Sequence, residues 1–533
     1  MLFYKQRTPL FILFIIWSIK ISLFKQLRGK VSYFLPKNQY FCKKKRAIIF
    51  MNANYYFRLL FGPALGIAIM LFGNLDAQNP LVSRMAGITV WVAWWWMTEV
   101  VNLAVTSMLP FVLMPLLGVL DAKSTAFQYF DQIIFLFVGG FIISYAIEKW
   151  NLHQRLSLGI LGRVGGNPST ILAGVMGTTF FVSMWMSNTA TVMMFVSAVL
   201  AVNTQLKSLL SAQKQIDVSA ALLLGLAYSA TIGGMATLVG TPTNMIFYSF
   251  YTDKFPQAET INFASWFAVA FPISMVMVLI LYAVLRWWFI GDARHLAFDR
   301  SYFKNEYHKL GKMVYEEKVV ATITVLTAVL WFTRQSLPIG NMQLFGWGRL
   351  FPKDFVQDST VAVLMAMLLF LIPSRNHANK KILHWHDVQK LPFGIILLFG
   401  GGFALSKGFE VSGLSTYLAS QLHFLSAVHP LIIILCVCAV VCIISEFASN
   451  VASIQLVLPI LVAIQQSTGL SPLLLMIPAT LAASLGFMLP VATAPNTIVY
   501  GTQLVPLKAM FRVGFLLDVL GVMAIGLLCY WLL

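Results

Sequence analysis

Long apolar segments dominate this chain and limit it to structures that are stable in a lipid bilayer. Lipid offers no partner for an exposed backbone N–H or C=O group, so segments of this kind must be helices. We therefore expect an all-α polytopic membrane protein with about 11 transmembrane segments. The uninterrupted apolar segments lie near 58–74, 85–98, 101–119, 132–149, 264–290, 318–334, 359–372, 393–410 and 510–533.

Three further apolar blocks, 169–203, 218–250 and 429–505, are interrupted by polar, Gly or Pro clusters. The first contains SMWMSNTATVMMF at 183–195, and no charged residue lies between Ser169 and Asn203. A polar kink between two helices is the usual explanation of one such triplet. Gly and Pro end a helix and Ser, Thr and Asn begin the next one, so these blocks predict broken helices.

An internal repeat supports the prediction of broken helices. LFVGGF at 136–141 and LFGGGF at 398–403 are 262 positions apart, and so are Ser187-Asn188 and Ser449-Asn450. VGTPTNMIFY at 239–248 matches VATAPNTIVY at 491–500 with a shift of 252. Three landmarks in the same order indicate that each half contains one copy of the same structural unit.

Basic loops predict the orientation of these units. Lys and Arg concentrate in 286–318 and 375–390, which the positive-inside rule places in the cytoplasm. Membrane crossings counted from a cytoplasmic N-terminus also place both loops in the cytoplasm, provided that 169–203 is a hairpin that returns to its own side. The same count places the C-terminus outside. The two units are then inverted repeats, which in secondary transporters meet at a midplane binding site.

The N-terminal residues differ from the rest of the chain. Residues 1–50 hold 11 of the 37 Lys and Arg and no acidic residue. They are either a basic arm near anionic lipid or an untranslated extension before Met51, and we favour the second. The expected domains are 1–54 (basic extension), 55–130 (scaffold helices), 131–253 (first repeat), 254–390 (scaffold helices and basic loop), 391–505 (second repeat) and 506–533 (last transmembrane helix).

The interrupted blocks predict ion chemistry. Helix N-termini that point at one place favour an anion, and freed carbonyl groups with Ser and Asn oxygens suit sodium. Since 169–203, 218–250 and 431–505 contain no Lys or Arg, a bound anion would be neutralised by helix dipoles and co-bound cations. We expect no other cofactor, and the local origin of the +18 net charge argues against nucleic acid as a partner.

Other polar residues are weaker candidates. Cys436, Cys438 and Cys442 lie in an apolar run without His or acid in step, and His384 and His386 form a loop pair without a third ligand. Neither set predicts a metal site. Glu446 is either a proton or cation relay or a residue that orients the hairpin by accepting backbone N–H groups, and we favour the second. Glu99 is expected near the membrane interface beside an aromatic belt at 94–96.

Residues 55–533 resemble the divalent anion/sodium symporter family, which includes INDY-type sodium-coupled carriers of succinate and citrate. The resemblance rests on the paired hairpin tips, the paired GTPTN and ATAPN breaks, WWWMTEV at 94–100 and VGFLLD at 513–518. It implies a homodimer, an outer scaffold and a transport unit that moves like an elevator. The expected location is a bacterial inner membrane, in contact with lipid.

The same resemblance implies the site residues. One sodium site would use Ser183, Ser187, Asn188 and Gly240, and the other Ser445, Ala448, Asn450 and Ala492. The substrate would contact Ser187, Asn188, Thr189, Ser449, Asn450 and Val451, with Thr241, Pro242 and Thr493 as walls. Val451 replaces a threonine and Ala494 stands where many relatives have proline, so substrate choice is the less certain part.

These features favour a sodium symporter that imports a C4-dicarboxylate such as succinate, malate or fumarate. A sodium-independent exchanger, or a carrier of citrate or sulfate, would share the fold. An intramembrane enzyme is disfavoured because the apolar segments contain no nucleophile with a base beyond lone serines and Glu446. A channel is disfavoured by the paired broken-helix units.

Overall fold

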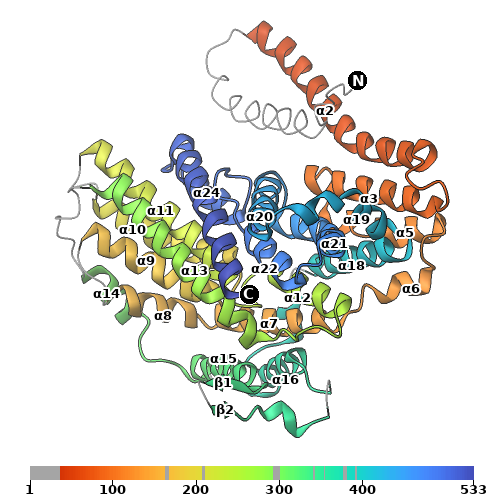
Figure 1. Ribbon diagram of the computed structural model, residues 1–533. Coiled ribbons are helices and arrows are strands. Elements are labelled where there is room, and N and C mark those ends of the chain that lie inside the picture. The colour runs from red at the N-terminus through yellow and green to blue at the C-terminus, as the bar shows by residue number, and fades with distance from the viewer. Residues whose placement is uncertain are drawn as a thin grey trace.

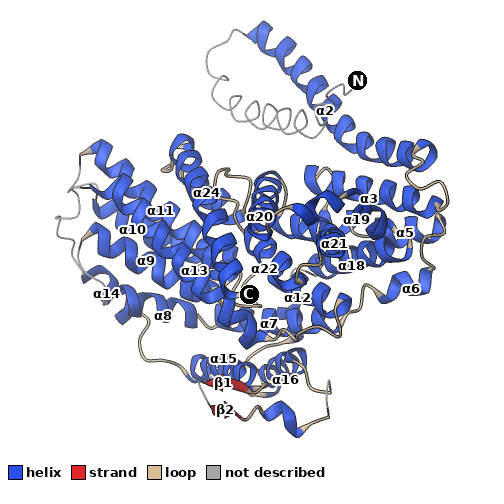
Figure 2. Cartoon of the chain, viewed as in Figure 1, coloured by secondary structure: helices blue, strands red, loops and turns tan. Residues whose placement is uncertain are grey.

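The computed structural model describes residues 37–162, 167–206, 211–291, 301–339, 342–352, 355–375, 381–389 and 393–533. These residues form helices almost throughout, which confirms the expected all-α class (Figure 2). The exception among them is a hairpin of two three-residue strands, β1 (Leu337–Ile339) and β2 (Met342–Leu344). Residues 1–36 of the predicted N-terminal extension lie outside the described residues.

The first helices pack side by side. They are α2 (Lys37–Phe72), α3 (Pro80–Thr98), α4 (Leu103–Thr106), α5 (Leu109–Leu116) and α6 (Ala122–Phe127). Close contact between α2 and α3 depends on Gly66, because a β-carbon there would come within 2.6 Å of the Gly87 carbonyl oxygen.

The tryptophan run at the end of α3 does not form the aromatic belt that the sequence predicted. Trp94 and Trp96 are buried inside the protein. The indole N–H of Trp94 donates to the Arg58 carbonyl of α2 at 2.7 Å, and that of Trp96 donates to the Ser107 hydroxyl at 3.1 Å. The prediction was wrong because an indole satisfies its N–H equally well inside a helix bundle as at a membrane interface.

The two repeats have the same order of elements. The first contains α7 (Gln132–Lys149), α8 (Leu152–Leu161), α9 (Pro168–Ser183), α10 (Asn188–Leu206), α11 (Ala212–Met235), α12 (Pro242–Lys254), α13 (Phe263–Leu285) and the π-helix η2 (Arg286–Ile290). The second contains α18 (Gly394–Val411), α19 (Leu414–Gln421), η5 (His423–Ala427), α20 (Pro430–Phe447), α21 (Asn450–Thr468), α22 (Pro472–Ala482), α23 (Ala494–Gly501) and α24 (Leu507–Leu532).

Each repeat has a helical hairpin followed by a broken helix, as predicted. The hairpins are α9–α10 and α20–α21, and the broken helices are α11–α12 and α22–α23. The repeats also contact each other reciprocally: α10 packs against α23, and α21 packs against α12. Figure 1 shows α12 close to α21. Each hairpin therefore meets the second half of the other repeat's broken helix, which places both tips and both breaks in one region.

The remaining helices connect the repeats. They are α14 (Ser301–Lys309), α15 (Tyr315–Thr333), the 3-10 helix η4 (Trp347–Leu350), α16 (Asp358–Leu371) and α17 (Trp385–Val388). Helix α16 packs along α7, and α15 packs on both of these helices. A buried ion pair between Arg334 and Asp358 joins the end of α15 to the start of α16.

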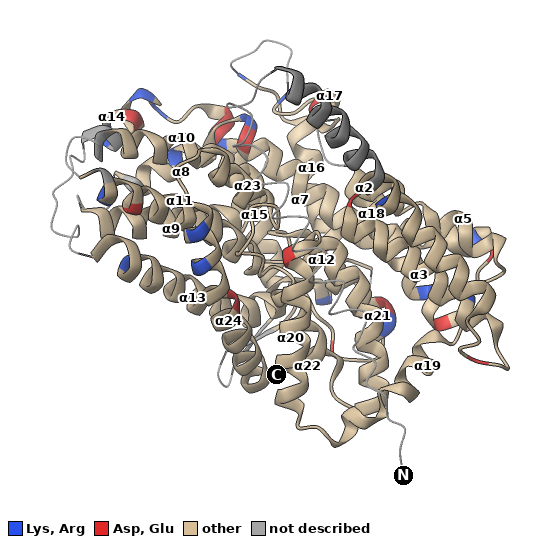
Figure 3. Ribbon diagram, turned by 90° about the horizontal axis from the view of Figure 1, so that it is seen from above, with Lys and Arg blue, Asp and Glu red and all other residues tan. Residues whose placement is uncertain are grey.

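Eight helices of the described part are long and apolar enough to span a membrane. The expected number was about 11, and the difference has a sequence cause. Helix α15 begins with three charged residues within its first turn, and α3 carries Arg84 and several tryptophans, so neither is apolar enough to be counted. The expected spans 101–119 and 359–372 form apolar helices of 10–17 residues, which are too short to be counted. Figure 3 shows long stretches of ribbon, including α13 and α22, without a charged residue.

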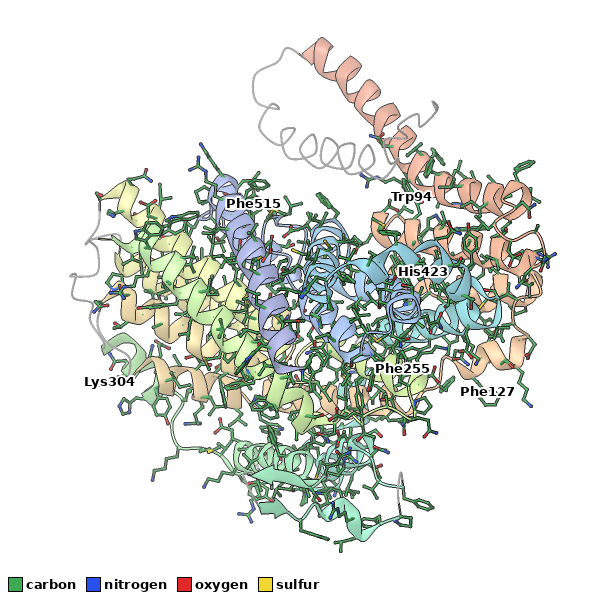
Figure 4. The ribbon with its side chains drawn as sticks, in the orientation of Figure 1. Trp94, Phe127, Phe255, Lys304, His423 and Phe515 are labelled. Carbon is green, nitrogen blue, oxygen red and sulfur yellow. The ribbon has the colours of Figure 1, made fainter. Side chains whose placement is uncertain are left out.

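The crossing count expects two of the loops on opposite sides of the membrane. Lys304 belongs to a loop predicted to be cytoplasmic, and Phe127 to a loop predicted to be outside. Figure 4 places these two residues at opposite edges of the molecule. The opposed orientation of the repeats and the domain boundaries stay predictions.

Candidate functional site

The two hairpin tips have the same hydrogen bond. The Ser183 hydroxyl at the end of α9 donates to Oδ1 of Asn188 at 2.8 Å. In the second repeat the Ser445 hydroxyl donates to Oδ1 of Asn450, also at 2.8 Å. Both serines are fully buried. The repeat seen in the sequence therefore extends to individual atoms, and it brings hydroxyl and amide oxygens together where each hairpin turns.

The two broken helices are also stabilised in the same way. The amide nitrogen Nδ2 of Asn244 donates to the Gly234, Met235 and Thr237 carbonyl oxygens at 3.1, 3.2 and 2.7 Å. These carbonyls lost their helical partners where α11 ends. Such groups need a replacement partner when they are buried.

Asn496 has the equivalent role in the second repeat. Its Nδ2 donates to the Gly486 and Leu489 carbonyl oxygens at 2.8 and 3.0 Å. Sequence reasoning assigned no role to either asparagine. The signal was present, since Asn244 and Asn496 close the matched motifs GTPTN and ATAPN.

One cavity of about 930 Å³ lies where the tips and the breaks meet. Twelve of the fourteen predicted site residues line it. They are Ser187, Asn188, Thr189, Gly240, Thr241, Pro242, Ala448, Ser449, Asn450, Val451, Ala492 and Thr493. The other two, Ser183 and Ser445, lie beneath the cavity surface and reach it through their hydrogen bonds to Asn188 and Asn450. The structure thus brings together residues more than 250 positions apart in the sequence.

Four helices begin at this cavity. The first residues of α10, α12, α21 and α23 are Asn188, Pro242, Asn450 and Ala494, and all four line it. The free N–H groups of a helix start, together with its dipole, make a favourable environment for an anion. Ser449 begins α21 without a side-chain capping bond, so its hydroxyl is not committed to the helix start. The arrangement suits a solute with negative charge at both ends.

Oxygen atoms also gather behind each tip. A β-carbon placed on Gly234 would touch Oδ1 of Asn188 and come within 3.1 Å of the Gly240 carbonyl oxygen. At the equivalent place in the second repeat, a β-carbon on Gly486 would lie 3.6 Å from Oδ1 of Asn450 and 3.3 Å from the β-carbon of Ala492. Neutral oxygen ligands around a small space suit a hard monovalent cation. The predicted members of each sodium site therefore lie close together.

Charged residues outside the interrupted blocks also line the cavity. Arg58 of α2, Glu99 at the end of α3 and Glu148 of α7 do so. The position of Glu99 near a membrane interface stays a prediction. The interrupted blocks contain no basic side chain, so Arg58 adds to the cavity lining a positive charge that was not expected from the sequence. Local sequence could not reveal this, because these residues reach the cavity only through the packing of α2, α3 and α7 around the hairpin tips.

Glu446 connects one hairpin to one break. Its carboxylate accepts the backbone N–H groups of Met488 and Leu489 at 2.7 and 3.1 Å. This agrees with the favoured interpretation, an acceptor of backbone N–H groups, but the donors belong to the loop after α22 and not to the hairpin itself. Glu446 therefore fixes the loop that leads to Ala492 and Thr493.

The other weak candidates lie away from the cavity. Cys438 and Cys442 are buried in α20, and Cys436 is exposed on it. The His384 backbone N–H donates to the Asp387 carboxylate, and His386 contacts Gln389 at 2.9 Å. None of these residues lines the cavity.

Comparisons with known proteins agree with this geometry. Residues 55–533 match the family described as the sodium:sulfate symporter transmembrane region. The sodium-dependent dicarboxylate transporter SdcS of Staphylococcus saprophyticus is 37% identical over 506 residues, covering 93% of this chain and 95% of that protein. SdcS of Staphylococcus aureus is 38% identical over 500 residues, covering 93% and 94%.

Two solved membrane transporters share the fold at low sequence identity. MtrF of Neisseria gonorrhoeae, described as one of a class of antimetabolite efflux pumps, has a TM-score of 0.53 at 14% identity and covers 79% of this chain and 84% of its own. The YdaH transporter of Alcanivorax borkumensis has a TM-score of 0.51 at 12% identity and covers 79% and 88%. The family match over nearly the whole chain decides the assignment: this protein is an integral membrane transporter that belongs to the sodium:sulfate symporter family.

Proposed function

We propose that the protein imports a C4-dicarboxylate, such as succinate, malate or fumarate, by symport with sodium ions. The observation that carries the proposal is the convergence of four helix N-termini from two repeats on one cavity. Helices α10 and α12 would form one pair of N-termini, and α21 and α23 the other. Each carboxylate of a short diacid would then have its own pair. The names of the SdcS relatives support the same solute class.

Sodium would complete the site. Ser183, Asn188 and Gly240 would supply oxygens to one ion, and Ser445, Asn450 and Ala492 to the other, with Ser187 and Ala448 at the tips. Each ion would lie behind a tip whose front faces the anion, so Asn188 and Asn450 would contact both cation and substrate. Binding of sodium would then increase the affinity for the substrate, and binding of the substrate would increase the affinity for sodium by the same coupling free energy.

The membrane potential explains why coupling is useful. A dianion that enters a cell with an inside-negative potential works against about 2.3 kcal/mol per charge for each 100 mV. Enough co-transported sodium reverses the sign of the net charge moved. The potential then drives import instead of opposing it.

The cavity would open to the cytoplasm in this conformation. Its lining includes Glu99 at the end of α3 and Glu148 near the end of α7, and the crossing count places both ends inside. Transport would require the hairpin tips to move past α2, α3 and α7 to the other face. An elevator-like displacement of the two hairpins and broken helices, in each subunit of a homodimer, would accomplish this.

Uptake into proteoliposomes tests the proposal. Labelled succinate uptake should require an inward sodium gradient and fall to background when choline replaces sodium. Malate and fumarate should compete with it, whereas citrate and sulfate should compete poorly. Uptake that is unchanged in choline, or that appears only with a dicarboxylate inside, would identify a sodium-independent exchanger; preferred competition by sulfate or citrate would assign the substrate differently.

A further inference from the structure

A second cavity lies away from the polar site, between η2 and the start of α24. It has a volume of about 620 Å³ and is lined by Trp288, Phe289, Pro506, Lys508, Ala509, Arg512 and Val513. None of the described residues that line it is acidic. The lining combines two cations and two aromatic rings with an otherwise apolar wall. Such a lining suits an amphipathic ligand that has an anionic group and an apolar part.

The two cations have no counter-ion in the part of the chain that the structure describes. Lys508 and Arg512 are one helical turn apart on the same face of α24, and neither takes part in an ion pair among the described residues. Both are exposed. A third cation is close, because a β-carbon on Gly291 would lie 3.6 Å from Nζ of Lys214. This concentration of positive charge is available to an external anion.

An apolar stripe continues from the two cations along the same face of α24. Phe515, Val519, Met523 and Leu527 follow at four-residue intervals, and each is more than a third exposed. Helix α13 packs beside α24 and exposes Val276 and Leu279. Figure 4 labels Phe515 on α24. In a membrane protein, such a stripe faces acyl chains.

Aromatic residues place the cavity at a membrane interface. Trp287 and Trp288 of η2 are exposed, at 78% and 44%. Exposed tryptophans next to basic residues at the end of a spanning helix are typical of the headgroup level. The crossing count assigns this end of α13 and α24 to the cytoplasmic leaflet, where anionic lipids attract Lys and Arg.

We propose that this cavity binds one anionic phospholipid. Its phosphate would lie between Lys508 and Arg512, the glycerol region against Trp288 and Phe289, and the acyl chains along the exposed stripe of α24 and α13. The site is separate from the polar cavity and does not depend on which solute is carried. It requires only that α13 and α24 face lipid.

Native mass spectrometry of the full-length protein in mild detergent tests this site. Phosphatidylglycerol and phosphatidylcholine with the same acyl chains are titrated separately, and inorganic phosphate is added in a third series. The variant is Lys508→Gln/Arg512→Gln. The matched control is Lys312→Gln/Lys318→Gln, which removes two exposed cations from the same predicted face without touching the cavity.

The expected result is one phosphatidylglycerol bound in preference to phosphatidylcholine, with affinity lowered roughly 30-fold in the cavity variant, from two basic contacts. The control should bind like the wild type. Lys508→Arg/Arg512→Lys, which keeps both charges, should retain binding and so separates charge from misfolding. Equal loss in the control, equal binding of phosphatidylcholine, or full displacement of the lipid by inorganic phosphate would overturn the proposal.

Discussion

At the scale of single residues, the site depends on two pairs of asparagines with different roles. Asn188 and Asn450 line the cavity, and a buried serine hydroxyl beneath the cavity surface donates to Oδ1 of each at 2.8 Å. Asn244 and Asn496 instead use their amide nitrogens to satisfy backbone carbonyls. The first pair would bind ligands, and the second pair stabilises the fold. Substitutions in the first pair should therefore reduce transport, and those in the second should reduce stability.

Replacing either tip asparagine with alanine should abolish transport without unfolding the protein. Asn188→Ala and Asn450→Ala each remove an oxygen that we assign to both sodium and substrate, which should lower substrate affinity roughly 10- to 100-fold. Proteoliposome uptake and binding measure the effect. Asn305→Ala, on exposed α14, is the matched control, and near-normal uptake in both tip variants would remove the site assignment.

The break asparagines should affect stability first. Asn244→Asp and Asn496→Asp keep the shape but replace the donating nitrogen with an oxygen, so buried carbonyls lose their partner at about 1–3 kcal/mol each. The thermal midpoint should fall for both, and further for position 244, which has three acceptors where position 496 has two. Unchanged midpoints in both variants would contradict this role.

At the scale of elements, an ion pair ties α17 to the end of α7. Lys149 contacts Asp387 at 2.7 Å. Burial alone would raise the pKa of Asp387, but hydrogen bonds from Lys149 and from the His384 backbone outweigh it and lower the pKa below the ordinary 3.8. A lowered carboxyl pKa contributes stability that is complete above the unfolded-state pKa and is lost as pH falls through the folded value.

Asp387→Asn tests that contribution. The variant should unfold at a lower temperature than the wild type near neutral pH, and the difference should vanish at a pH below the lowered pKa of Asp387. The effect should be small because the pair is partly exposed to solvent. A difference that stays constant down to that pH would show that the carboxylate charge is not its cause.

The elements also show which features a sequence of this kind reveals. Both hairpins and both breaks could be predicted, because polar, Gly and Pro clusters within apolar blocks interrupt helices whatever surrounds them. The cavity contacts of Arg58 and Glu148 could not, since they depend on how α2 and α7 pack against the tips. The Trp94–Trp96 run was misinterpreted because burial and interface anchoring favour the same residue type.

At the scale of the whole molecule, two similar halves would have to lie in opposite orientations across the membrane. Single cysteines report this in intact cells. Lys312→Cys should react with an impermeant maleimide only after the membrane is permeabilised, whereas Phe127→Cys should react before. Both positions are exposed, and the unmodified chain controls for its own cysteines. Reaction of both variants from the same side would contradict the inverted arrangement.

The proposed homodimer and elevator movement also belong to this scale. A cavity shared by both hairpins and by α2, α3 and α7 can reach two membrane faces only if one group of helices moves past the other. The hairpins and broken helices of the two repeats would form the moving group, and α2, α3 and α7 would belong to the fixed frame. Mass photometry of the detergent-solubilised protein should give twice the mass of one chain.

One cavity would hold a dicarboxylate and sodium together, each improving the binding of the other. Calorimetric titration of succinate into the purified protein, in sodium chloride and in choline chloride at equal ionic strength, measures this directly. We expect tight binding only with sodium, and the same factor of improvement in sodium affinity when sodium is titrated with and without succinate. Equal succinate affinity in sodium and in choline would contradict it.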